Sequence, residues 1–245
     1  MNDKLSDALA APEVVDRATF QIELDALRVR EKAHTRAGDA VAAARRRLPM
    51  VKVEGATPLV GKDGPVTLLE AFEGRRMLIA YYYMWFPGKP APEQCEGCTW
   101  VTSQVRELSY IHARDITFAV LCQGPYEESI RYREFMGWDM PWYSAQASRD
   151  TLLAGRRIGM MHLVCYLRRG SDVFETYWTW MRGVEAMDNS YRLIDLSVYG
   201  RQETWEDSPT GWPRRELVVR TNGRPTAQWA RLNSGHSDDL GTGRR

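Results

Sequence analysis

The sequence predicts an α/β protein in which helices flank a central mixed β-sheet and an N-terminal helical extension precedes it. Three observations support this fold class. Residues 77–86 and 116–122 form nearly continuous apolar and aromatic runs, as expected for strands buried on both faces of a sheet. Helical spacing of apolar residues follows each run, which favours parallel pairing of these strands. Residues 161–168 and 173–180 indicate two antiparallel strands joined by a tight turn at Gly170.

The N-terminal region, residues 1–50, is the predicted helical extension. Residues 13–47 have helical character with a thin apolar stripe, and Gly38 is expected to break or bend the helix. A second short helix is then expected to end before Pro49. Because so thin a stripe cannot stabilise a helix alone, we expect it to pack on the main domain or on a second copy. A homodimer through these helices is therefore a prediction.

Composition limits the remaining organisation and the classes of partner. The chain of 245 residues is predicted to hold its main domain in residues 51–215 and a polar C-terminal tail in residues 216–245. A net charge of +1 supplies no global field for nucleic acid or an anionic membrane, so neither is an expected partner. The sequence has no apolar leader and no membrane-spanning run, which favours a cytoplasmic location.

The sharpest chemical feature is a pair of cysteines, Cys95 and Cys98, separated by two residues. The pair follows a predicted buried strand and opens a predicted helix. Backbone N–H groups and the helix dipole stabilise a thiolate at such a position and lower its pKa. We therefore expect Cys95, the more exposed thiol, to attack a disulfide and Cys98 to resolve the mixed disulfide. Glu96 is either a solvent-exposed residue of the first helical turn or a charge that raises the thiol pKa.

Other interpretations of the cysteine pair stay open. A closed zinc site needs two more ligands at similar spacing, and the sequence has no second such pair; no metal and no cofactor are expected. Two buried structural thiols are a further alternative. Cys122 at the end of the second buried strand and Cys165 within a later strand are expected to be small core residues. Aromatic residues near the pair either pack at the rim of the core or line a substrate groove, and three are candidates for substrate binding: Trp85, Trp100 and Trp142.

These residues resemble a bacterial thioredoxin-like family of unknown function over about residues 14–215. The segments that carry the resemblance are 48–49, 77–86, 95–100, 113–118, 136–144, 173–177 and 191–196. The resemblance implies a thioredoxin-like fold of peroxiredoxin-type topology, with Cys95 and Cys98 at the redox position. It does not imply a substrate.

Two departures from related folds shape the functional prediction. Thioredoxins place a cis-proline before the strand that faces the cysteines, but residues 156–162 contain no proline. Peroxiredoxins often carry an arginine nearby, a role that Arg156 or Arg157 could fill. They also carry a threonine three residues before the cysteine, where this chain has Pro92. The resemblance therefore favours thiol–disulfide exchange with a protein or small-molecule disulfide; a thiol peroxidase and a non-enzymatic binding module are the alternatives.

Overall fold

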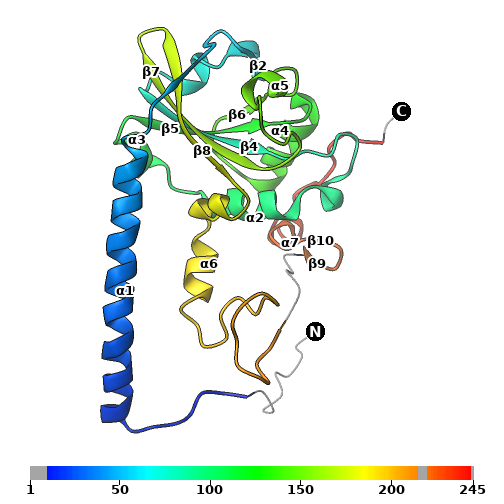
Figure 1. The fold of residues 1–245 in the computed structure, drawn as a ribbon. Helices are drawn as coiled ribbons and strands as arrows, with labels where there is room; N and C mark the ends of the chain where they lie inside the picture. The colour runs from blue at the N-terminus through cyan, green and yellow to red at the C-terminus, as the bar shows by residue number, and fades with distance from the viewer. Residues whose placement is uncertain (1–9, 215–219, 244–245) are drawn as a thin grey trace. The chain divides into compact units, whose positions relative to one another are not determined.

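The computed structural model describes residues 10–214 and 220–243, which fall into two compact units (Figure 1). The larger unit, Met50–Leu193 with Val218–Arg245, contains the β-sheet and the cysteine pair. The smaller unit, Met1–Pro49 with Ile194–Leu217, contains the long N-terminal helix. Each unit is described separately below.

Eight strands of the larger unit form one mixed sheet in the order β1-β8-β7-β4-β5-β6-β2-β3. Strands β4, β5 and β6 are parallel, whereas β7 pairs antiparallel with β4, and β8 pairs antiparallel with β7. The strands are β1 (Val51–Val53), β2 (Pro58–Gly61), β3 (Gly64–Thr67), β4 (Met77–Tyr83), β5 (Ile116–Cys122), β6 (Trp142–Ser144), β7 (His162–Arg169) and β8 (Asp172–Trp180).

The central strands confirm the predicted fold class. Met77 pairs with Ile116 and Tyr83 with Cys122 in the parallel β4–β5 ladder, and both strands are almost entirely buried. The order β8-β7-β4-β5, with a helix between β4 and β5 that begins beside the cysteine pair, is a thioredoxin-like arrangement. The predicted hairpin is also present, because β7 and β8 meet at a turn in which Gly170 has a φ of 64°.

Helices cover both faces of the sheet and create two cores. Tyr81 and Tyr83 point to one face, which is covered by α2 and α4, whereas Tyr82 points to the opposite face. This separation follows from the alternation of side chains along a strand. The helical elements are η1 (Glu70–Phe72), η2 (Ala91–Glu93), α2 (Glu96–Gln104), α3 (Ser109–His112), α4 (Tyr126–Met136), α5 (Arg149–Leu152), η3 (Met181–Met187), α6 (Asn189–Ile194) and α7 (Gln228–Asn233).

The N-terminal region forms one helix where two were predicted. Helix α1 (Arg17–Arg45) is continuous through Gly38, which was expected to break or bend it, and it takes in most of the separate short helix that was expected before Pro49. A glycine in an exposed helix costs only about 1 kcal/mol relative to alanine, which one position in a long helix tolerates. The carboxylate of Asp16 caps the first turn by accepting from the Thr19 N–H at 2.9 Å. No residue of α1 is buried, and no helix among the described residues combines the length and apolar character needed to cross a bilayer.

The C-terminal segment also differs from the polar tail expected from composition. Its described part forms a hairpin of β9 (Arg220–Thr221) and β10 (Arg224–Pro225), followed by α7. Gln228 and Leu240 are buried, and Leu240 belongs to the core on the α2 side of the sheet. Polar side chains of the segment, those of Arg220, Gln228 and Arg231, donate hydrogen bonds to the rest of the unit. The residues of the predicted tail at 216–219 and 244–245 lie outside the described residues.

Candidate functional site

Cys95 is the N-cap residue of α2, directly beyond the loop that follows β4. Its Sγ accepts a hydrogen bond from the backbone N–H of Cys98 at 3.3 Å, as a side chain at this position does when it caps a helix. Cys95 is 9% exposed and Cys98 is fully buried. The structure therefore confirms that the pair opens a helix and that Cys95 is the more accessible of the two thiols.

The pKa values of the two thiols are shifted in opposite directions. A hydrogen bond from the Cys98 thiol lowers the pKa of Cys95, and the backbone N–H groups of Cys98 and Gly97 lower it further against the opposing effects of burial and of the Glu96 charge. Burial raises the pKa of Cys98, and the adjacent Cys95 raises it further. The site can thus hold one thiolate at Cys95 while Cys98 stays protonated.

Arg220, which the sequence analysis did not single out, contacts the loop that leads into Cys95. It forms an ion pair with Glu96, so this carboxylate is not a lone solvent-exposed charge. Its guanidinium also donates to the carbonyl of Pro92 at 2.6 Å and to that of Gln94 at 3.0 Å. No local pattern marks an arginine in a polar segment more than a hundred residues away as part of this site.

A buried hydroxyl network supports the backbone at Cys95. Thr99 Oγ1 donates to the Cys95 carbonyl at 2.8 Å and lies 2.9 Å from Tyr83 Oη and 2.7 Å from Tyr132 Oη. Because Thr99 has one hydroxyl proton, both tyrosines must donate to its oxygen. Gln228 Nε2 in turn donates to Tyr132 Oη at 2.6 Å and to the Ala91 carbonyl at 2.8 Å. Gln228 is the second site residue that sequence reasoning missed.

Two methionines lie beside the cysteine pair. The Cys95 thiol contacts Met84 Sδ at 3.8 Å. Met161 directly precedes β7, the position at which thioredoxins carry the cis-proline, and no peptide bond among the described residues is cis. Its Cε lies 3.7 Å from where a Cβ on Gly97 would be, so Met161 covers the spacer between the two cysteines. The surroundings of Cys95 are therefore apolar as well as hydrogen-bonded.

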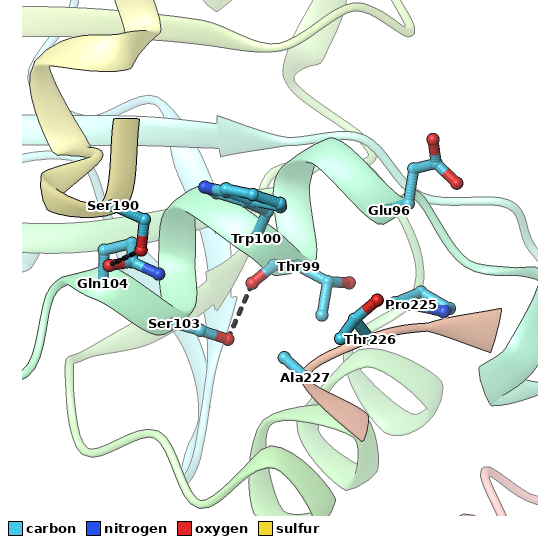
Figure 2. A pocket seen from close by; sticks show the side chains of 9 residues that line it. All are labelled: Glu96, Thr99, Trp100, Ser103, Gln104, Ser190, Pro225, Thr226 and Ala227. Atoms are coloured by element: carbon cyan, nitrogen blue, oxygen red, sulfur yellow. Dashed lines mark hydrogen bonds between the residues drawn. The ribbon is translucent and has the colours of Figure 1, made fainter. Parts of the chain in front are cut away.

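A pocket of about 210 Å³ runs along the α2 side of the site (Figure 2). Trp100 forms part of its wall and contacts Tyr191, with 5.1 Å between ring centroids. The opposite wall comes from Thr226 and Ala227, which join β10 to α7 (Figure 2). Glu96 lines its end, so the pocket begins one residue from Cys95. The other lining residues are Thr99, Ser103, Gln104, Ser190 and Pro225.

The other two tryptophans considered for substrate binding lie in the core. Trp142 is 4% exposed, and its Nε1 donates to Ser129 Oγ at 3.1 Å. Trp85 is 6% exposed, and its Nε1 donates to Glu128 at 3.0 Å. A Cβ at Gly124 would lie 2.0 Å from the Trp85 ring, so the ring fits here only because residue 124 has no side chain. The structure therefore brings only Trp100, of the three, to the pocket.

The structure does not bring Arg156 together with the cysteines. Arg156 forms an ion pair with Glu175, and its guanidinium carbon lies 4.7 Å from the centroid of the Trp178 ring. Trp178 pairs with Val164, which belongs to the core on the Tyr82 face. Arg156 is therefore on the opposite face of the sheet from Cys95. Cys122 is buried beside the α2 core, and burial raises its pKa to about 12.

The described residues contain no group of three or more His, Cys, Asp or Glu side chains that could hold a metal ion.

Comparison with known proteins places the chain in a family. A family model described as a bacterial protein of unknown function, DUF899, matches residues 9–232. No curated protein matches the chain. Among solved structures, the peroxidoxin BcpB from Mycobacterium tuberculosis is similar, with a TM-score of 0.40 and 15% identity over 54% of this chain and 85% of that chain. Because the family model spans most of the sequence, this chain belongs to the DUF899 family of bacterial proteins of unknown function.

Proposed function

We propose that this protein catalyses thiol–disulfide exchange, with Cys95 as the attacking thiol and Cys98 as the resolving thiol. The observation that carries the proposal is the asymmetry of the pair. Cys95 caps α2, and its pKa is lowered by the Cys98 thiol and by backbone N–H groups. Cys98 is fully buried, and its pKa is raised by that burial. Such a difference favours one nucleophile at a time.

The proposed reaction proceeds in two exchanges. The Cys95 thiolate attacks one sulfur of the substrate disulfide, forms a mixed disulfide and releases the other sulfur as a thiolate. Cys98 then loses its proton and attacks Cys95 Sγ, which forms the Cys95–Cys98 disulfide and releases the second substrate thiolate. The substrate gains the two electrons that the cysteine pair loses. An external dithiol must reduce the pair before another turnover, and the reverse sequence oxidises a dithiol substrate.

The site surroundings are consistent with a protein or small-molecule disulfide as the partner. Cys95 retains a small exposed area beside Met84 and Met161, whose soft thioether chains adapt to varied apolar surfaces. The pocket at Trp100 begins at Glu96, one residue from the attacking sulfur. We propose that it receives an apolar side chain of a protein substrate next to the disulfide.

Titration of the pair against glutathione buffers tests the proposal. Alkylation followed by mass analysis should show one two-electron transition that forms the Cys95–Cys98 disulfide. Cys95→Ser should abolish reduction of a protein disulfide, and Cys98→Ser should accumulate the mixed disulfide on Cys95. Cys165→Ser serves as the matched control, because Cys165 lies within β7 and not at the start of α2.

Two results would contradict the proposal. One is the absence of a Cys95–Cys98 disulfide at every buffer potential. The other is unchanged turnover in the Cys95→Ser variant. A partner protein retained equally by the wild type and by the Cys95→Ser, Cys98→Ser double variant would instead support a binding module of thioredoxin-like fold.

A further inference from the structure

We propose that Arg220 is a positioning residue for Cys95, which holds the loop before it in shape and offsets the charge of Glu96. This inference deepens the proposed disulfide exchange and rests on it. Arg220 begins the short β9–β10 hairpin and is remote in sequence from the cysteine pair. It does not touch the reacting sulfur, because its hydrogen bonds go to backbone carbonyls of the loop and of its own hairpin, and its ion pair is with Glu96.

The loop from Pro90 to Cys95 combines hydrogen bonds of its own with donors from outside it. Pro90 and Pro92 have no backbone N–H, so they cannot contribute to a local hydrogen-bond ladder. Arg220 supplies two N–H donors to this loop, one to the Pro92 carbonyl and one to the Gln94 carbonyl. The second of these carbonyls belongs to the peptide that enters Cys95, so the contact fixes the backbone at the start of α2.

The ion pair with Glu96 adds an electrostatic effect at the same place. Glu96 follows Cys95 directly, and a neighbouring carboxylate disfavours a thiolate. The guanidinium of Arg220 forms an ion pair with this carboxylate and offsets its charge. The three contacts use the three different nitrogens of the guanidinium group, a spread that the single ammonium nitrogen of lysine does not reproduce.

The other titratable groups near Cys95 are neutral near pH 7 and remain in every variant below. The Cys98 thiol is buried next to it. The phenols of Tyr81, Tyr83 and Tyr132 also interact with Cys95, and burial raises the pKa of each. Among the titratable groups around Cys95, the Glu96 and Arg220 variants below therefore change only the ion pair between these two residues and leave the neutral neighbours in place.

The test measures the pH dependence of Cys95 alkylation by iodoacetamide in the reduced full-length protein, with the modified peptide identified by mass. Arg220→Met should shift the midpoint upward by about one pH unit, so that alkylation below the midpoint slows roughly tenfold. Arg220→Lys should give an intermediate shift, because it keeps the charge and loses the two carbonyl contacts. Glu96→Gln should move the midpoint downward, because it removes the carboxylate and leaves the cation.

Arg224→Met is the matched control in the same hairpin. Arg224 pairs with Asp238 at 3.0 Å and lies against Trp229, so its loss breaks an ion pair without touching the cysteine loop. Its alkylation profile should coincide with that of the wild type. A profile of folded Arg220→Met that coincides with the wild type would overturn the inference. If Arg220→Met does not fold, an unchanged profile in Glu96→Gln would overturn it.

Failure of this inference is distinguishable from failure of the proposed function. Alkylation reports the Cys95 thiolate and needs neither a substrate nor a disulfide. If the wild-type pair forms its disulfide and Arg220→Met keeps the wild-type alkylation profile, the role of Arg220 is refuted and the proposed function is not. A pair that never oxidises refutes the proposed function, whatever the alkylation profiles show.

Discussion

Tyr82 and Tyr83 are consecutive in β4, yet their hydroxyl groups belong to two different polar networks. Tyr83 points to the α2 face, where its hydroxyl meets Thr99 and, through it, the backbone of Cys95. Tyr82 points to the opposite face and shares a hydrogen bond of 2.8 Å with Tyr166. The alternation of a single strand therefore supplies both faces of the sheet with buried phenols.

The two networks differ in where they lead. On the α2 face, hydrogen bonds run from Gln228 through Tyr132 and Thr99 to the cysteine loop. On the Tyr82 face, Tyr82 and Tyr166 interact electrostatically with the largely buried ion pair between Arg156 and Glu175. One network consists of neutral groups that support a reactive sulfur, whereas the other includes two opposite charges. The comparison separates residues that should affect thiol chemistry from residues that should affect stability alone.

Arg156→Met should produce the largest loss of stability. Its side chain is 9% exposed and that of Glu175 is 14% exposed, so the substitution leaves a carboxylate buried without its cation. We expect the free energy of unfolding to fall by about 3–5 kcal/mol. Chemical denaturation measures this loss, and alkylation of Cys95 in the folded variant should match the wild type because Arg156 lies on the other face.

Arg76→Met is the control for that prediction. Arg76 pairs with Asp115, but its side chain is 75% exposed. Removing this surface pair should lower the free energy of unfolding far less than removing Arg156 does, because solvent screens the two charges. Equal losses in the two variants, or slower Cys95 alkylation in Arg156→Met, would contradict the assignment of Arg156 to a structural ion pair remote from the cysteines.

Tyr132→Phe and Tyr82→Phe should cost similar stability but differ in their chemistry. Each substitution removes one buried hydroxyl from a hydrogen-bond network, for which about 1–3 kcal/mol is expected. Of these two tyrosines, only Tyr132 is hydrogen-bonded to Thr99, which in turn donates to the Cys95 carbonyl. Alkylation of Cys95 should therefore change in Tyr132→Phe and stay constant in Tyr82→Phe. Identical alkylation profiles in the two variants would show that the network does not reach the thiol.

His162 should make the stability of the Tyr82 face depend on pH. The ring is fully buried, and burial lowers its pKa from the model-compound value of 6.5. Below pH 6.5 the unfolded chain binds a proton at His162 that the folded protein does not bind. The free energy of unfolding therefore decreases as the pH is lowered from 6.5 to the pKa of His162 in the folded protein. Denaturation at pH 7.5 and 5.5 should show a smaller difference in His162→Phe than in the wild type. A control without the exposed His34, His34→Gln, should keep the wild-type difference.

Trp100→Ala should have the smallest effect and tests substrate binding on the α2 face. Trp100 lines the pocket that begins at Glu96. Loss of one aromatic contact of about 1 kcal/mol should raise the KM for a protein disulfide roughly fivefold. The rate with a small disulfide should stay constant. Trp142→Phe is the control, because Trp142 lies in the core; equal KM values for the two variants would remove the pocket from the substrate site.

Local patterns were sufficient for the centre of this fold. The apolar runs that become β4 and β5 have no other stable place than the middle of a sheet. The position of Cys95 at the start of α2 follows from the strand before it and the helical spacing after it. These features depend on neighbours in sequence, and the structure confirms them.

Features that depend on distant partners could not be predicted in this way. The side of the sheet on which Arg156 lies depends on a register that includes an irregularity at Cys165 and Tyr166. Arg220 and Gln228 stand in a polar segment whose composition is typical of a tail. Their roles come from hydrogen bonds to the cysteine loop, and hydrogen-bond partners leave no periodic pattern in the sequence.

The predicted homodimer remains a prediction.

The bonds between Arg220 and the cysteine loop have a consequence for how the protein is made. They join residues separated by 128 and 126 positions of the chain. A ribosome releases the cysteine loop well before it releases Arg220, and at about 5–20 residues per second the interval lasts on the order of ten seconds. During that interval Cys95 lacks its arginine. Nascent chains thus pass through a period in which the thiol has yet to acquire its mature reactivity.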